Sequence, residues 1–147
     1  MTAGLASNTK KAIEYIVRRI EDKTSVKVAT SNAIKAGIFS ADFDNFPAAW
    51  VRRGAETRYA HETSRGVFAQ MDILVAVAVK SLDAPEDAME EIIQEIENAV
   101  LSDADQNSSV TDTQLRSISE PTYFFEAGLG EAVMTFQIIT EYTEANR

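Results

Sequence analysis

VFAQMDILVAVAVK, residues 67–80, contains two interleaved sets of side chains. Every second residue, starting from Val67, belongs to an almost purely apolar set that is rich in β-branched residues: Val67, Ala69, Met71, Ile73, Val75, Val77 and Val79. An alternation with a period of two predicts a β-strand, and its apolar face has to be covered by helices. The other set is mixed and becomes apolar towards Lys80, so part of that face could also be covered, for example by another subunit.

The segments around this strand predict three further strands. Phe46-Pro47-Ala48-Ala49-Trp50-Val51 opens one that runs through Arg58, with Pro47 at its start, where no ladder N–H is needed. A polar turn at residues 61–65 then leads into the strand at 67–80. Near the end of the chain, we expect strands at 113–125, with Pro121 at an edge or bend, and at 131–142. We place Gly128 and Gly130 in the turn between them.

Two amphipathic helices accompany these strands. Residues 8–23 carry an apolar stripe formed by Ile13, Ile16, Val17 and Ile20, and Ser7 or Asn8 could cap that helix. A second helix starts at Asp83-Ala84-Pro85-Glu86, with Asp83 as the N-cap, Pro85 in the first turn and Glu86 in the capping-box position. Its apolar stripe consists of Met89, Ile92, Ile93, Ile96 and Val100.

The order of these elements predicts an α+β fold. We expect a single domain over residues 1–147, with a mixed, largely antiparallel sheet of four or five strands and two helices packed on one face, in the order α-(β)-β-β-α-β-β. Residues 24–46 receive no firm assignment: Val26 and Val28 alternate, and residues 32–35 could form a helical turn that ends at Gly37. Residues 102–112 are rich in Asp, Ser and Asn, which is typical of a loop.

Composition restricts the classes of function. The 147 residues carry a net charge of −9, which argues against a general nucleic-acid binder, since that function requires clustered Lys and Arg. The absence of cysteine excludes disulfides, thiolate zinc sites and cysteine nucleophiles. The first eleven residues lack the apolar stretch of a signal peptide, and the longest apolar run, residues 73–79, is too short to cross a bilayer. We therefore expect a soluble protein that is made inside the cell.

Charge is distributed unevenly along the chain. Residues 1–80 carry 12 basic and 8 acidic side chains, a net charge of +4, whereas residues 81–147 carry 2 basic and 15 acidic ones, a net charge of −13. Two interpretations stay open: a hydrated acidic surface, or head-to-tail self-association of a basic with an acidic surface. The candidate interface residues are the arginines of the first predicted hairpin and the acids of the second helix: Arg52, Arg53, Arg58, Arg65, Glu90, Glu91 and Glu95.

Groups that could perform chemistry are few. His61 is the only histidine, so a two-histidine metal site within one chain is impossible. Asp103-x-Asp105-x-Asn107 matches the start of a calcium loop, but Ser108 and Gln114 stand where glycine and a bidentate glutamate are needed. Asp42-Phe43-Asp44 and the acidic side of the second helix are weaker candidates, and no glycine-rich phosphate loop is present. We expect no catalytic residue, no cofactor and no metal site.

The whole pattern resembles the tail terminator proteins of long-tailed bacteriophages, the minor tail protein U-like family. The resemblance covers about residues 5–143 and rests on element order and two segments. One is the proline-led strand that starts at Phe46 and ends in Gly54-Ala55-Glu56, and the other is the final strand, Gly130–Tyr142, of the form Phe136-x-Ile138-x-x-x-Tyr142. The acidic helix with its Ala99-Val100-Leu101 end also contributes. Residues 24–46 are longer than the family pattern leads us to expect.

The resemblance implies a non-enzymatic virion protein located in the tail or neck and assembled in the host cytoplasm. Such a protein forms a homo-hexameric ring on the head-proximal end of the tail tube, stops tube polymerisation and provides the interface for head–tail joining. Its partners would be copies of itself, the tail tube protein, a neck or connector protein and, in a contractile tail, the sheath protein. DNA would pass through the lumen without specific binding, and no membrane would be involved. Two alternatives stay open: another neck component such as a stopper, and a small hydrolase or ligand-binding module that uses Asp42, Asp44, His61 or the acidic helix.

Overall fold

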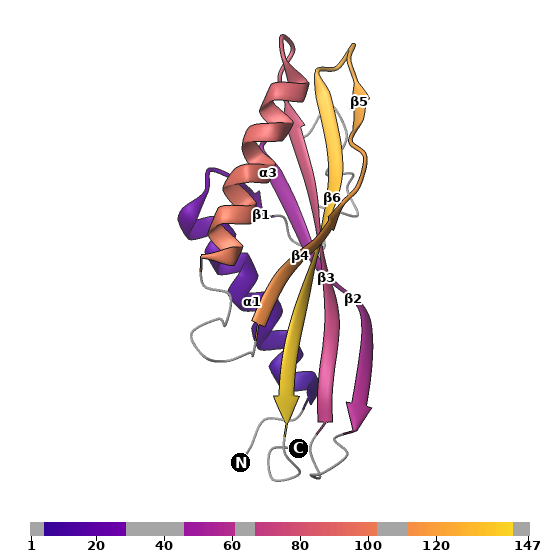
Figure 1. Cartoon of the computed structure of the whole chain (residues 1–147). Helices are drawn as coiled ribbons and strands as arrows, with labels where there is room; N and C mark the ends of the chain where they lie inside the picture. The colour runs from indigo at the N-terminus through magenta and orange to yellow at the C-terminus, as the bar shows by residue number, and fades with distance from the viewer. Residues whose placement is uncertain (1–4, 29–45, 61–66, 103–111, 143–147) are drawn as a thin grey trace.

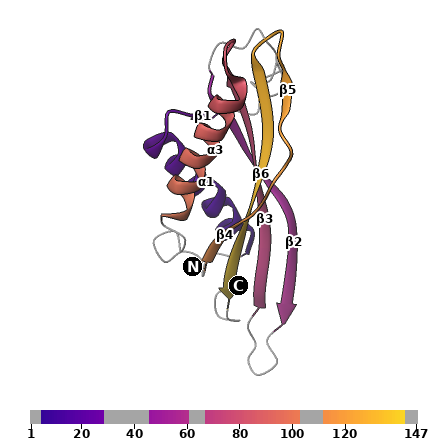
Figure 2. The ribbon, with the colours of Figure 1, turned by 45° about the horizontal axis from the view of Figure 1, so that its top comes forward.

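The computed structural model describes residues 5–28, 46–60, 67–102 and 112–142 (Figure 1). Its elements follow the chain in this order: α1 (Leu5–Lys23), β1 (Lys27–Val28), β2 (Ala48–Ala60), β3 (Val67–Lys80), α3 (Pro85–Leu101), β4 (Asp112–Ile118), β5 (Thr122–Phe124) and β6 (Leu129–Tyr142). Figure 2 shows both helices on one face of a long, twisted sheet. The predicted α+β architecture, with two helices on one face, is confirmed.

The sheet has six strands in the order β1-β2-β3-β6-β4, with β5 also paired to β6. Only β1 and β2 are parallel, and the other pairs are antiparallel. The count exceeds the predicted four or five because the strand expected at 113–125 is divided into β4 and β5. Pro121 lies in the gap between them, as expected of a residue that lacks a ladder N–H. The short β1 also joins the sheet through Lys27 and Val28.

The core lies between the helices and one face of the β3–β6 pair. The predicted apolar face of β3 is buried from Met71 to Val79, and β6 contributes four further buried side chains to the same face: Ala132, Met134, Phe136 and Ile138. On the helix side, the core is completed by Ile16 and Ile20 of α1 and by the predicted stripe of α3. The expectation that helices cover this face of the strand is therefore confirmed.

The opposite side of the sheet, which we call the open face, carries the alternate residues. Pairing places Trp50, Ala76 and Val133 in one row across three strands, and Arg52, Leu74 and Thr135 in the next. Neither α1 nor α3 lies over this face (Figure 2), and these side chains are half-buried except for the exposed Arg52. In the row beyond Trp50 and Ala76, Ala48 and Ala78 of the same face are fully buried. The change from polar to apolar residues along β3 therefore leaves apolar side chains on a sheet face that no described helix covers.

Both predicted helix caps are wrong. Helix α1 begins at Leu5, so Ser7 and Asn8 lie inside it. In α3, Pro85 occupies the first helical position and Ala84 the N-cap, without a side-chain capping bond. Asp83 therefore precedes the cap, and Glu86 is too close to the helix start for a capping box. Instead, Ser81 Oγ accepts a hydrogen bond from the Ala84 N–H at 3.2 Å.

Other local expectations have mixed outcomes. Gly128 lies in the turn before β6, with a φ of +65°, whereas Gly130 belongs to β6 itself, contrary to prediction. The polar turn at 61–65, the helical turn at 32–35 with Gly37, and most of the loop at 102–112 fall outside the described residues. Neither described helix combines the length and the apolar character needed to span a membrane.

Phe136 provides a test of the core. Its side chain is fully buried between β3 and the helices, so we expect Phe136→Ala to lower the free energy of unfolding by about 3–5 kcal/mol. Leu82→Ala is the matched control, since Leu82 is 73% exposed and its truncation should change stability by less than about 0.5 kcal/mol. Equilibrium denaturation monitored by circular dichroism measures both, and equal losses in the two variants would contradict this description of the core.

Candidate interaction surfaces

Arg52 lies on the open face, beside Trp50. The two residues are two positions apart in β2 and therefore point to the same side of the sheet. The guanidinium carbon of Arg52 is 5.3 Å from the centroid of the Trp50 ring, within the range of a cation–π contact. Arg52 is exposed, and none of the described carboxylates forms an ion pair with it.

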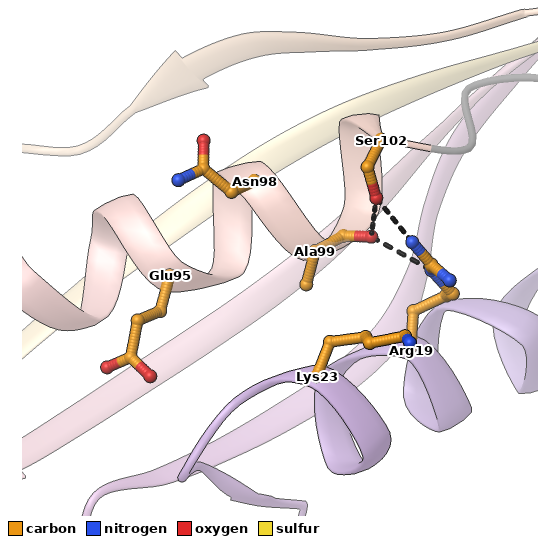
Figure 3. Close-up of a pocket in the computed structure, with 6 residues that line it drawn as sticks. All are labelled: Arg19, Lys23, Glu95, Asn98, Ala99 and Ser102. Atoms are coloured by element: carbon orange, nitrogen blue, oxygen red, sulfur yellow. Dashed lines mark hydrogen bonds between the residues drawn. The ribbon is translucent and has the colours of Figure 1, made fainter.

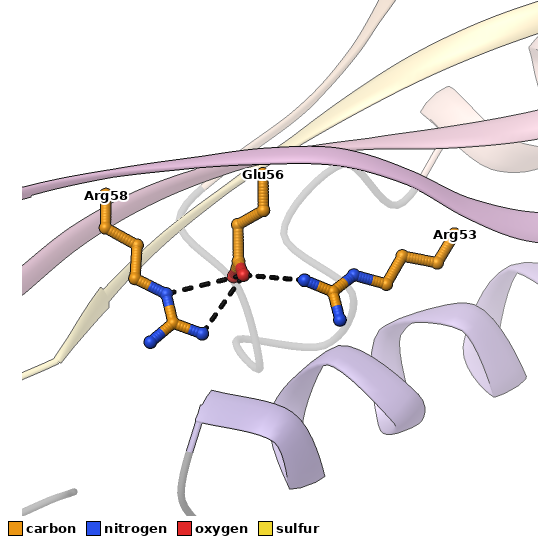
Figure 4. A network of polar contacts seen from close by, with 3 residues as sticks. All are labelled: Arg53, Glu56 and Arg58. Atoms are coloured by element: carbon orange, nitrogen blue, oxygen red, sulfur yellow. Dashed lines mark hydrogen bonds and ion pairs between the residues drawn. The ribbon is translucent and has the colours of Figure 1, made fainter.

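Arg53 and Arg58 lie on the helix-facing side of the same strand and share one carboxylate (Figure 4). Glu56 Oε2 accepts hydrogen bonds from Arg53 Nη2 at 2.8 Å and from Arg58 Nη2 at 3.1 Å and Nε at 3.3 Å. The Glu56 side chain is only 8% exposed, whereas the two guanidinium groups are about half exposed. These two arginines thus enclose an acid of their own chain.

The predicted basic patch is therefore divided between two faces of the sheet. A β-bulge between Arg53 and Glu56 shifts the register of β2, and Gly54 lies inside it. A Cβ at Gly54 would approach Asp72 Cβ of β3 to 3.0 Å, a tighter contact than side chains normally make. Arg65, the fourth predicted arginine, lies outside the described residues. Of the three described arginines of this patch, Arg52 is the one that pairs with no acid in the part of the chain that the structure describes.

The predicted acids of α3 lie on its outer side. Glu90 and Glu91 are exposed and, with Gln94 and Glu95, line a surface hollow. Glu95 is half-buried, and its Oε1 lies 3.5 Å from the backbone nitrogen of Ser25, which follows α1. The three glutamates lie on one side of the helix, as expected. Among the described residues, none of them forms an ion pair with Arg52, which contacts Trp50 instead.

Arg19 forms a contact that sequence reasoning missed (Figure 3). From α1, its Nε donates to the carbonyl oxygen of Ala99 at 3.0 Å, and its Nη2 donates to Ser102 Oγ, at the end of α3. The Ala99 carbonyl oxygen also accepts a hydrogen bond from Ser102 Oγ at 3.2 Å. The last turn of α3 contains no basic residue, so this cation from α1 complements the negative end of the helix dipole. Asn98 and Lys23 line the same pocket. The missing basic residue in α3 was the only sequence signal.

The open face also contains an ion pair that joins two strands across a third. Arg116 of β4 reaches over β6, and its Nη1 lies 3.2 Å from Asp72 Oδ1 of β3. A β-bulge between Leu115 and Ser117 provides the extra residue that turns Arg116 to this face. Because Arg116 is 59% exposed, we assign the pair only a small share of the stability.

One end of the molecule exposes large apolar side chains. Leu82, in the β3–α3 connection, is 73% exposed, Phe124 at the end of β5 is 48% exposed, and the adjacent Phe125 is 62% exposed. We call these three residues the apolar tip. The two turns are joined by a hydrogen bond from the Ser81 N–H to the Gly128 carbonyl oxygen at 2.7 Å. Tertiary structure thus gathers apolar side chains from two turns that are distant in sequence.

Acidic groups surround the apolar tip. Asp83, Glu86 and Asp87 line a hollow together with Leu82 and Phe125. Tyr123 stacks on Phe125 with ring centroids 5.6 Å apart, and burial, followed by the charges of Glu86 and Glu90, raises the pKa of the Tyr123 hydroxyl. The negative potential of the α3 side therefore extends to the aromatic side chains of this end.

The candidate chemical groups of the sequence are not brought together in the described ranges. His61, Asp42, Asp44 and the calcium-like segment 103–107 lie outside them. Within the part of the chain that the structure describes, no group of three acidic or histidine side chains is arranged to hold a metal ion. The described surface instead carries exposed acids on α3 and exposed apolar side chains at one end.

Comparisons with known proteins identify the fold. No family model matches this chain, and no curated protein matches it. Among solved structures, a chain from the virion of a native gene transfer agent particle has a similar fold, with a TM-score of 0.56 at 12% sequence identity. The likeness covers 95% of this chain and 99% of that chain. It therefore extends over nearly the complete arrangement of helices and sheet.

Arg19 provides the test of the contact between α1 and α3. Arg19→Met keeps most of the aliphatic stem but removes the hydrogen bonds to Ala99 and Ser102, so we expect it to lower the free energy of unfolding by about 1–2 kcal/mol. The adjacent, exposed Arg18 is the matched control, and Arg18→Met should have an effect below about 0.5 kcal/mol. Urea denaturation of both variants measures the difference, and indistinguishable midpoints would contradict the role of Arg19.

Proposed function

We propose that this chain is a structural virion protein of a long-tailed bacteriophage or a related particle, with residues 1–147 acting as one domain. The observation that carries the proposal is the likeness of fold, over nearly the full length of both chains, to a chain of a gene transfer agent virion. The sequence resemblance to tail terminator proteins points in the same direction. The surfaces described above suit this role, because they present charge and apolar side chains to other macromolecules instead of enclosing a small molecule.

Within the virion, the role we propose is that of tail terminator. Copies of the chain form a ring, hexameric by the family resemblance, at the head-proximal end of the tail tube. The ring stops the tube from growing and offers its other side to a connector protein, and in a contractile tail it also meets the sheath. A closed ring requires two different patches that meet between neighbours. The exposed Arg52 and the acids of α3, among them Glu90 and Glu91, have the opposite charges that such patches need.

The acidic character of the chain also fits a channel for DNA. Helix α3 carries exposed acids along its outer side and no basic residue in its last turn. A wall of this kind repels phosphate, so DNA slides through without binding. This contribution needs no base contact and no enzymatic step, in line with a protein that acts by assembly alone.

Tail tube growth tests the proposed role. In a mixture of purified protein and growing tail tubes, we expect negative-stain images to show extra density on one tube end and tubes that stop lengthening. Tubes without the protein should continue to grow. Native mass spectrometry should detect a species of six times the 16.2 kDa chain, either free or released from the capped tubes. Binding to the portal side alone, with tubes that lengthen undisturbed, would identify a stopper and contradict the terminator role.

A further inference from the structure

The apolar tip is a projection that the core of its own chain does not cover. Three of the four exposed large hydrophobic residues among the described ones lie at this end, Leu82, Phe124 and Phe125, and two of them, Leu82 and Phe125, line one hollow. Monomeric proteins rarely gather large apolar side chains at one exposed site without an interaction partner. Asp83, which precedes α3, and Glu86 and Asp87 in its first turn adjoin the tip, so a matching partner needs an apolar surface beside a positive charge.

Backbone contacts join the two turns that form the tip. The Ser81 N–H bonds to the Gly128 carbonyl oxygen at 2.7 Å, which joins the turn of Leu82 to that of Phe125. Gly128 has a φ of +65°, and a Cβ there would lie 2.8 Å from Leu82 Cα, so only glycine allows the two turns to approach this closely. These contacts fix the position of the two turns relative to each other, which lowers the conformational entropy that the backbone of the tip loses on binding.

The open face of the same chain offers the matching surface. Trp50, Leu74 and Val133 are half-buried neighbours there, and no described helix covers them. Arg52 stands beside this apolar area, with its guanidinium over Trp50 and no carboxylate partner in the described part of the chain. The open face thus places the cation of Arg52 beside apolar side chains, a combination that matches the apolar tip and its acids, while Asp72 of the same face is paired with Arg116.

We propose that the apolar tip of one copy docks on the open face of the next copy, where Arg52 pairs with the acids beside the tip. The inference rests on the proposed ring and names its subunit contact. The tip lies at one end of the molecule, and the open face lies on the side of the sheet away from the helices (Figures 1 and 2). Since the two patches differ and point in different directions, the contact is heterologous and repeats from copy to copy until a ring closes.

Charge favours a second copy over two other occupants of the tip. The acids around Leu82 and Phe125 repel the phosphates of nucleic acid, so DNA does not dock there. The same acids oppose approach to an anionic membrane surface. The open face of a second copy of this chain supplies both the apolar area and the cation, so two copies can bind each other without another molecule.

A pair of introduced cysteines tests the contact, because the chain contains none of its own. The variant carries Leu82→Cys in the tip and Thr135→Cys on the open face, next to Leu74. With a short bis-maleimide crosslinker, we expect a ladder of covalent dimers, trimers and larger species on a denaturing gel. The control variant carries Leu82→Cys with Lys11→Cys, an exposed position on α1, and should give at least tenfold less product above the dimer. Equal ladders in the two variants, or none in either, would overturn the inference.

A charge exchange provides a second, independent readout. Arg52→Glu in the Leu82/Thr135 cysteine variant should lower the yield of the ladder about tenfold, because it places like charges at the contact. Adding Asp87→Arg should restore most of the yield, whereas a loss of fold would not be restored by a distant second substitution. Unchanged crosslinking after Arg52→Glu would contradict the pairing that we propose.

The crosslinking result and the tail tube experiment separate the two proposals. A ladder from a protein that leaves tube growth unchanged would support the subunit contact and reject the terminator role. Capped tubes without a ladder, with the variants tested on the tubes themselves, would support the terminator role and reject this contact.

Discussion

The burial of one face of the β3–β6 pair beneath α1 and α3 is the interaction on which the rest of the structure depends. Phe136, Ile73 and Val75 have no exposed surface. The two helices pack side by side on the sheet because burying their apolar stripes against this face stabilises them. The same alternation that buries every second residue turns the intervening residues to the opposite side. An open face with Leu74 and Val133 therefore follows from the same register that forms the core.

Charged side chains join α1 to α3 and pair with one another on β2. Arg19 connects α1 to the carboxyl end of α3, and Glu56 occupies the guanidinium groups of Arg53 and Arg58. These internal pairs reduce the number of cations that can meet another molecule. Arg52 stays exposed, and Glu86, Asp87, Glu90 and Glu91 of α3 form no ion pair with any described residue. The difference in net charge between residues 1–80 and 81–147 is thus seen in the structure as a small basic site at Arg52 and a broad acidic side on α3.

The likeness to a virion chain concerns the fold. A fold shared over nearly the full length of both chains, at 12% identity, shows that very different sequences satisfy the same arrangement of sheet and helices. The core tolerates such changes as long as the apolar pattern and its volume are kept. Surfaces are free to diverge further, so the apolar tip and Arg52 are where we expect this chain to specify its own neighbours.

The sequence by itself determined the strands, the helices and the side of each that is buried, because periodicities of two and 3.6 residues are local properties. It predicted β3 with its bounds, the stripe of α3 from Met89 to Val100, and the acidic side of that helix. Only the tertiary structure decided which charges face one another. The bulge at Gly54 placed Glu56 and Arg58 on the same side of the sheet as Arg53, away from Arg52, and the approach of Gly128 to Leu82 brought the two turns of the apolar tip together. Such contacts join residues that are far apart along the chain, and they depend on register and close packing, which a repeating pattern does not encode.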